Sequence, residues 1–459
     1  MNLCTYFVAD SEGDESIFPQ AGSMHSSSSN EFQEIYYRCV VTFFTSLRVF
    51  SENQNLYFFS NHIPDRLSDG FKFRDYLVSI GVNVIELEFT KRLPIKQAHF
   101  GNVFYVLDVL EYCRDNNISP IIACDNDCLA LSDISELTNS VLENTILAYG
   151  MPLRGDKELN GLTQADCKDI VSTVFSQARD QELKFYGGEF YAFGSNALNR
   201  VVDCFLPIFA KNREFCRKGE RYFKTEEQLL SSVFHCIDLQ VNDVSGVVQR
   251  LYNSSLGNSE MVSKVKLAHL LQKKNTGLKK LYQFIKDGIM SINSTPKAWD
   301  DCLYRHIIPE AQELPLIKIN HKDLGPESLV SVSSIYQNMD PNCCLDENWT
   351  LTNFLHTNDE VEPWALFDLQ NVCFIDSVHL VDRIGFAERS NSLIIEISSD
   401  ATNWEVVFNR KDQAIENDGR VKVYSAKLDS EARFVRVRLA ARGCLNFHKI
   451  VIDAVQKTH

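Results

Sequence analysis

Apolar runs alternate with amphipathic stretches over the first two thirds of the chain. Strands are predicted at 4–10, 55–61, 82–89, 118–131 and 185–193. Helical spacing of bulky residues is found at 32–50, 71–80, 102–114, 161–180, 223–236 and 276–292. Alternation of this kind is typical of a largely parallel sheet covered by helices. We therefore expect an α/β domain in which a mixed, mostly parallel sheet carries helices on both faces.

The pattern changes near residue 326. Short alternating runs such as SVHLVD, SLIIEISSD and VKVYSAKL follow one another, separated by polar turns, which indicates an antiparallel all-β sandwich or barrel. Before them, prolines at 296, 309 and 315 indicate a connector. The sequence thus predicts a domain at 1–295, a connector at 296–325 and an all-β sandwich at 326–459.

The length and the net charge of the chain limit the classes of protein to which it can belong. A chain of 459 residues exceeds the roughly 250 to 300 residues at which single cores stop growing. The formal net charge of −15 argues against a nucleic-acid partner, because such proteins cluster Lys and Arg against phosphates. No window approaches the ~18 to 20 apolar residues of a membrane span, and the N-terminus does not resemble a signal peptide. We expect a cytoplasmic protein, with peripheral membrane association left open.

The acidic tripeptide Asp125-Asn126-Asp127 follows directly on the apolar run IIAC. Ligands of open parallel sheets bind at the carboxyl ends of strands, so this position favours a role of the tripeptide in ligand binding. Two carboxylates one residue apart can share a divalent cation that neutralises a diphosphate leaving group. Turns after strands are also rich in Asp and Asn for conformational reasons, so the tripeptide alone does not decide between the two readings.

Three further features follow in order along the chain. A glycine turn with Gly187, Gly188 and Glu189 permits close approach of backbone to a ligand, although an ordinary hairpin has the same residues. Thr225 is a plausible N-cap for a helix whose first turn holds Glu226 and Glu227. Either acid could take a proton from an acceptor hydroxyl, or both could simply favour the helix dipole.

The last feature is a short apolar strand that ends at His269, with Lys273 and Lys274 close behind. An imidazole can complete the coordination of a cation such as manganese, and lysines can meet diphosphate oxygens. His321 is a rival for the metal ligand, and a structural histidine is the alternative to both.

In this order, the motifs DND at 125–127, YGGE at 186–189, TEEQ at 225–228 and AHL at 268–270 resemble the GT-A glycosyltransferases over about 1–295. The resemblance implies the GT-A nucleotide-diphospho-sugar transferase fold and a divalent metal, Mn²⁺ or Mg²⁺. It implies metal ligation by Asp125, Asp127 and His269, and a catalytic role for Glu227 or Glu226. For donor or acceptor binding it implies Asp125, Asp127, Gly187, Gly188, Glu189 and Lys273.

Residues 326–459 resemble a discoidin-type, galactose-binding-like domain, which the run SSDATNW at 398–404 marks most clearly. Domains of this kind often bind glycans through loops at one end. The resemblance offers Tyr336, His356, Arg383 and Phe386 as candidate glycan contacts, and Arg383 could equally be a structural partner.

Together the two resemblances imply a metal-dependent, hexosyltransferase-like enzyme, inverting or retaining, that moves a sugar from a nucleoside-diphosphate donor to a glycan hydroxyl. A UDP-sugar donor and a glycan or lipid-linked glycan acceptor in bacterial surface polysaccharide or lipopolysaccharide synthesis would fit. The alternative is a noncatalytic carbohydrate-binding protein with a degenerate transferase domain. Under the enzyme hypothesis, Asp127→Ala is expected to abolish transfer and leave the fold intact.

Overall fold

The chain divides into two compact units, Met1–Glu310 and Ala311–His459, which are treated separately below. The computed structural model describes residues 1–16, 26–51, 53–95, 100–153, 157–175, 182–251, 265–271, 273–306, 329–337, 339–345, 354–383, 386–410 and 422–456. His321, the rival metal ligand, lies outside these residues.

The main sheet of the first unit has seven strands in the order β3-β2-β1-β4-β7-β6-β8. They are β1 (Asn2–Phe7), β2 (Asn55–Ser60), β3 (Val82–Glu86), β4 (Ile121–Cys124), β6 (Ile146–Gly150), β7 (Tyr186–Phe193) and β8 (Val241–Asp243). β1 to β4 run parallel, and β8 is parallel to β6, whereas β7 is antiparallel to both of its neighbours. The sheet is therefore mixed and mostly parallel, as the sequence predicts.

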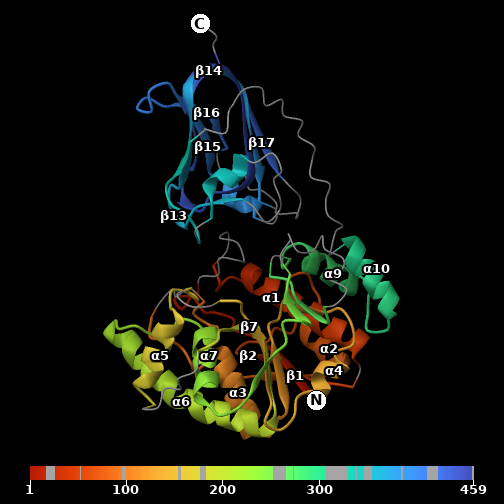
Figure 1. The fold of residues 1–459 in the computed structure, drawn as a ribbon. Helices are drawn as coiled ribbons and strands as arrows, with labels where there is room; N and C mark the ends of the chain where they lie inside the picture. Colours follow the sequence, from red (N-terminus) through yellow and green to blue (C-terminus); the bar gives the residue numbers. More distant parts are fainter. Residues whose placement is uncertain are drawn as a thin grey trace. The chain divides into compact units, whose positions relative to one another are not determined.

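Helices pack on both faces of this sheet (Figure 1). One hydrophobic cluster joins Leu3 and Ile122 to α1 (Asn30–Phe50), α2 (Phe73–Ser79), α4 (Ser135–Asn139), α9 (Gly277–Lys286) and α10 (Pro296–His306). A second joins Cys4 and Ile121 to α3 (Tyr105–Asp115), α5 (Gln164–Ser172), α6 (Ser195–Lys218) and α7 (Glu226–Cys236). Neighbouring residues of one strand thus enter opposite cores, because side chains alternate across a strand.

A small second sheet stands beside the main one, in the order β5-β10-β9. It consists of β5 (Cys128–Ala130), β9 (Val248–Arg250) and β10 (Leu267–His269). β10 runs antiparallel to β5 and parallel to β9, so that His269 lies opposite both Cys128 and Arg250. The single strand predicted at 118–131 is in fact two strands, because the acidic turn ends β4 and starts β5.

Three helices, the short α4 together with α6 and α10, lie where the sequence analysis predicted none. No element was predicted for 195–218, where the structure has α6, a helix of 24 residues with Pro207 inside it. The range 296–325 was predicted to be a connector, but its first part forms α10, whose Trp299 is fully buried in the first unit. The remainder of that range lies outside the described residues.

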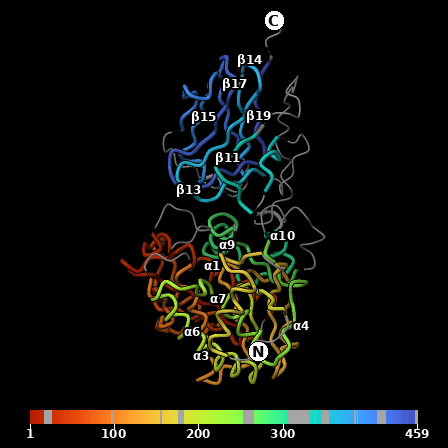
Figure 2. The backbone as a smooth tube through the Cα atoms, turned by 60° about the vertical axis from the view of Figure 1, so that its left-hand side comes forward, coloured from red at the N-terminus to blue at the C-terminus, as the bar shows by residue number. Residues whose placement is uncertain are grey.

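The described part of the second unit is all β apart from two short 3₁₀ turns, η1 (Pro341–Leu345) and η2 (Ala387–Ser390) (Figure 2). Its strands are β11 (Leu329–Val332), β12 (Leu355–His356), β13 (Glu360–Val361), β14 (Trp364–Asp382), β15 (Leu393–Ser398), β16 (Glu405–Asn409), β17 (Val423–Leu439), β18 (Arg442–Gly443) and β19 (Asn446–Gln456). All of these pair antiparallel. Register shifts bend β14, and the inward side chains enclose one apolar core. The predicted sandwich is confirmed.

Among the described residues, no helix has the length and apolar character that crossing a bilayer requires.

Candidate functional site

The acidic tripeptide forms the tight turn between β4 and β5. The backbone N–H of Cys128 donates to the carbonyl of Asp125 at 3.2 Å, and the N–H of Asp125 donates to the carbonyl of Glu189 on β7 at 3.2 Å. Asn126 Nδ2 donates to the carbonyl of Tyr6 on β1 at 3.1 Å. The middle residue therefore ties the turn to the sheet, while the two aspartates flank it.

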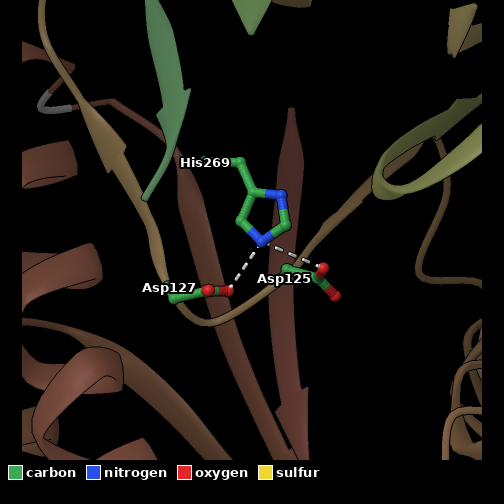
Figure 3. Close-up of side chains that lie close together, drawn as sticks. All are labelled: Asp125, Asp127 and His269. Carbon is green, nitrogen blue, oxygen red and sulfur yellow. Dashed lines mark ion pairs between the residues drawn. The ribbon is translucent and has the colours of Figure 1, made fainter. Parts of the chain in front are cut away.

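β10 brings His269 to these aspartates from about 140 positions further along the chain. Its Nε2 atom lies 3.1 Å from Asp127 Oδ1 and 3.6 Å from Asp125 Oδ2 (Figure 3). One ligand atom from each of the three residues lies within 4.8 Å of the other two. The backbone N–H of Leu270 also donates to the carbonyl of Asp127 at 3.0 Å, which holds β10 in this register.

The donor set fits a divalent cation. Two carboxylates and an imidazole suit ions between hard and borderline, such as Mn²⁺. The other ring nitrogen of His269, Nδ1, is buried without a hydrogen-bond partner among the described residues, so no carboxylate or carbonyl there fixes its tautomer. The side chain of Asp125 is 35% exposed, whereas that of Asp127 is 4% exposed, so a ligand can reach the cluster from the side of Asp125.

The charges of the cluster are strongly coupled. Partial burial raises the pKa of Asp125 above its ordinary value, against the favourable charge of His269. Burial would also raise the pKa of Asp127, but the charges of His269 and Lys274 outweigh it and hold that pKa well below its ordinary value. The carboxylates raise the pKa of His269 although its burial works in the opposite direction. The cluster therefore stabilises added positive charge.

Of the two lysines that follow β10, Lys274 contacts the acidic turn and Lys273 does not. Lys274 Nζ forms an ion pair with Asp127 Oδ2 and lies 5.6 Å from the centre of the Tyr36 ring. Lys273 is buried next to it, and burial lowers the pKa of Lys273 to about 8. The sequence singled out Lys273 for donor binding, but only the fold decides which neighbour faces Asp127.

Glu189 is fully buried in β7 and is held by Arg250 of β9. Arg250 Nε donates to Glu189 Oε1 at 2.8 Å and Arg250 Nη2 to Glu189 Oε2 at 2.7 Å, a bidentate pair. Sequence reasoning missed Arg250, because an arginine in a three-residue strand carries no local signal. Both oxygens of Glu189 are engaged by Arg250.

The two acids of α7 have different surroundings. Thr225 is the N-cap, as the sequence predicts. Glu227 Oε1 accepts from Arg250 Nη2 at 2.6 Å and from the backbone N–H of Gly188 at 3.1 Å. Glu226 is buried, and its Oε2 has no hydrogen-bond partner among the described residues. Burial, Glu227 and Asp125 raise the pKa of Glu226 well above its ordinary value, which favours a protonated carboxyl.

The glycines leave room for these acids. A Cβ on Gly188 would collide with Glu226 Oε1, and a Cβ on Gly187 would lie 2.6 Å from Arg250 Nη2 and closer still to Glu189 Oε2. Gly187→Ala is therefore expected to lower the free energy of unfolding by about 1 to 3 kcal/mol in urea titrations. Gly246→Ala is the control, because a Cβ there meets nothing within 4 Å. If Gly187→Ala and Gly246→Ala were equally stable, the expected collision at Gly187 would be refuted.

In the second unit, the four candidate glycan contacts gather in one patch. The rings of Tyr336 and His356 lie 4.6 Å apart, and the Arg383 guanidinium lies 4.4 Å from the ring centre of Phe386. Arg389, which the sequence analysis did not name, lies over the same Phe386 ring at 4.2 Å and its Nη1 is 3.3 Å from His356 Nε2.

His356 is held as a neutral imidazole. Burial and the neighbouring guanidinium groups of Arg389 and Arg383 lower the pKa of His356 to about 4. Its Nδ1 lies 2.6 Å from the carbonyl of Thr357, so Nδ1 carries the proton and Nε2 is the acceptor. Arg383 also lies 3.9 Å from the ring centre of Phe354, so stacking on two rings is the structural role observed for it.

The comparison with protein-family models concerns this second unit. Residues 330–448 match the family model of the F5/8 type C domain, which confirms the discoidin-like assignment for this part of the chain. The comparison with curated proteins found no match.

Several solved structures are similar to this chain. A fucose binding module of Streptococcus pneumoniae is 19% identical, with a TM-score of 0.25, and the match covers 30% of this chain and 99% of the module. A fucolectin from striped bass, Morone saxatilis, is 17% identical at a TM-score of 0.25, with 30% and 49% covered. A CBM32 module from a family 31 glycoside hydrolase of Clostridium perfringens is 18% identical at 0.24, with 27% and 93% covered.

Proposed function

We propose that the first unit is a metal-dependent glycosyltransferase that uses a nucleoside-diphosphate sugar. The observation that carries the proposal is the convergence of Asp125, Asp127 and His269, whose ligand atoms lie within 4.8 Å of one another. Their place at the carboxyl end of β4, in the middle of a mostly parallel sheet, is where open α/β sheets bind ligands. The GT-A resemblance of the four motifs agrees with this position.

A divalent cation held by these three residues would supply charge neutralisation for the departing nucleoside diphosphate. Asp125, the most exposed of the three, is the residue that a ligand meets first. Arg250 is held beside His269 by the pairing of β9 with β10, and Glu189 and Glu227 compensate its charge. We assign Arg250 the role of positioning the acids around the glycine turn.

Between the two acids of α7, Glu227 is the better candidate to accept a proton, because the raised pKa of Glu226 favours its protonated form. Arg250 and the N–H of Gly188 hold Glu227 Oε1, and Asn160 Nδ2 lies 3.4 Å from Glu227 Oε2. Glu226 keeps a carboxyl oxygen without a partner among the described residues. In the proposed reaction the acceptor hydroxyl bonds to the anomeric carbon, the bond from that carbon to the diphosphate breaks, and the carboxylate of Glu227 takes the hydroxyl proton. With Glu227 as the base, this single displacement inverts the anomeric carbon.

The test is metal-dependent binding of a nucleoside diphosphate. UDP with Mn²⁺ should raise the melting temperature of the full chain, because a ligand that binds only the folded state stabilises it. A panel of nucleotide sugars then identifies the donor by metal-dependent hydrolysis. The absence of any shift with every nucleoside diphosphate plus Mn²⁺ would refute the transferase and favour the noncatalytic carbohydrate-binding alternative.

We propose that the second unit binds a glycan through the patch of Tyr336, His356, Arg383, Phe386 and Arg389. The patch combines the guanidinium groups of Arg383 and Arg389 with the imidazole of His356, whose Nε2 orients Arg389 by accepting from its Nη1. Sugars present adjacent hydroxyls that need both donors and acceptors, and a ring such as Tyr336, 37% exposed, can cover an apolar sugar face. Family membership of residues 330–448 supports the assignment.

Arg389→Met is expected to weaken glycan binding by about tenfold or more, because a hydrogen bond to a charged group contributes about 1.5 to 3 kcal/mol. A glycan array with the full chain identifies a ligand, and calorimetry measures its affinity for both proteins. Arg410→Met is the control, since Arg410 also lies over a ring, that of Tyr424 at 4.8 Å. An equal loss of glycan affinity in both variants, or no loss in Arg389→Met, would refute glycan binding by this patch.

A further inference from the structure

Lys274 occupies an unusual position for a group next to a cation site. Its ammonium pairs with Asp127 Oδ2, and the side chains of Lys274 and Asp127 are only 7% and 4% exposed. The other oxygen of the same carboxylate, Oδ1, faces His269 Nε2 at 3.1 Å. Both oxygens of Asp127 therefore have a partner, and Oδ1 is the one that faces His269.

The lysine changes the charge that a divalent ion meets. Asp125 and Asp127 alone, with a neutral imidazole, carry two negative charges, which a divalent cation would cancel. With Lys274 in place the group carries one net negative charge, and a bound divalent cation leaves one net positive charge. The neighbouring Glu189, Glu227 and Arg250 are the same with and without Lys274, so the lysine by itself makes the metal-loaded group more positive and more attractive to an anion.

We propose that Lys274 is a built-in cation that makes metal binding depend on a diphosphate-like anion, so that the two bind cooperatively. The proposal deepens the proposed function, since it concerns the same three ligands. Asp127 keeps Oδ2 on Lys274 and offers Oδ1 to the metal, and the remaining positive charge attracts the diphosphate. Metal alone binds weakly, because Lys274 opposes it. Cooperativity of this kind is reciprocal, so the anion also binds weakly without metal.

Calorimetry on the full chain tests the coupling, with Mn²⁺, inorganic pyrophosphate and UDP as probes. For the natural protein, saturating pyrophosphate or UDP is expected to tighten Mn²⁺ binding by about 10- to 100-fold. Lys274→Met is expected to bind Mn²⁺ alone about tenfold more tightly and to lose most of the coupling. Lys274→Arg keeps the charge and should keep the coupling.

Lys211→Met is the matched control, because Lys211 pairs with Glu214 on α6 and should leave both quantities unchanged. Melting curves show whether each variant is folded. If Lys274→Met does not fold, the coupling measured in Lys274→Arg tests the proposal. Unchanged coupling in Lys274→Met, or lost coupling in Lys274→Arg, would overturn the proposal.

The outcomes separate this proposal from the transferase. If UDP and Mn²⁺ bind but Lys274→Met keeps the coupling, the lysine proposal fails and the transferase stands. If Mn²⁺ and pyrophosphate are coupled through Lys274 but UDP does not bind, the transferase fails and the lysine proposal stands. If the natural protein binds no Mn²⁺ with either anion, both are refuted.

Discussion

Asp127→Ala is expected to weaken Mn²⁺ binding by at least about 100-fold and to lower the free energy of unfolding by about 3 kcal/mol. The first effect follows because the change removes a ligand whose Oδ1 lies 3.1 Å from His269 Nε2. The second follows because Lys274, buried at 6% exposure, loses its carboxylate. From the sequence we expected an intact fold, and from the structure we expect in addition a lower stability, because Asp127 compensates a buried charge.

A second variant separates the two effects. Asp127→Ala combined with Lys274→Met removes both charges and should regain most of the lost stability, because no buried ion is left without a partner. Metal binding should stay lost. Urea unfolding and calorimetry with Mn²⁺ measure the two quantities. A double variant as unstable as Asp127→Ala would show that the ion pair is not the cause.

Arg250→Met is expected to lower the free energy of unfolding by about 3 to 5 kcal/mol, which is typical of an uncompensated buried charge. Glu189, with 0% side-chain exposure, would lose the bidentate partner of both its oxygens. Glu227 Oε1 would lose its 2.6 Å contact as well. Nucleoside diphosphate binding should weaken together with stability, because Glu189 and Glu227 would lose the cation that joins them beside the glycine turn.

Arg433→Met provides the comparison. Arg433 donates from Nε and Nη2 to Asp368, both at 2.8 Å, so it makes the same bidentate contact, but its side chain is 41% exposed. An exposed ion pair contributes about 0 to 1 kcal/mol, so the loss should be small. Guanidinium chloride or urea titrations measure both variants. Similar losses for Arg250→Met and Arg433→Met would show that burial of Glu189 does not set the effect.

Much of the fold could be predicted from local pattern. The period of apolar residues indicated the strands that became β1 to β4 and the helix that became α1, and the change near residue 326 indicated the sandwich. The pattern did not reveal α6, in which Pro207 stands inside the helix, or α10 in the supposed connector. Each depends on burial against the sheet, which a local window does not contain.

The sequence by itself determined the acidic turn at a strand end, the helix start at Thr225 and the class of the second unit. These follow from residues adjacent in the chain, whose preferences act locally. The tertiary structure alone decided that Lys274 faces Asp127, that Arg250 joins Glu189 to Glu227, and that Arg389 reaches His356. Such contacts depend on the register and packing of segments up to about 150 positions apart, where a shift of one residue turns a side chain to the opposite face of its strand.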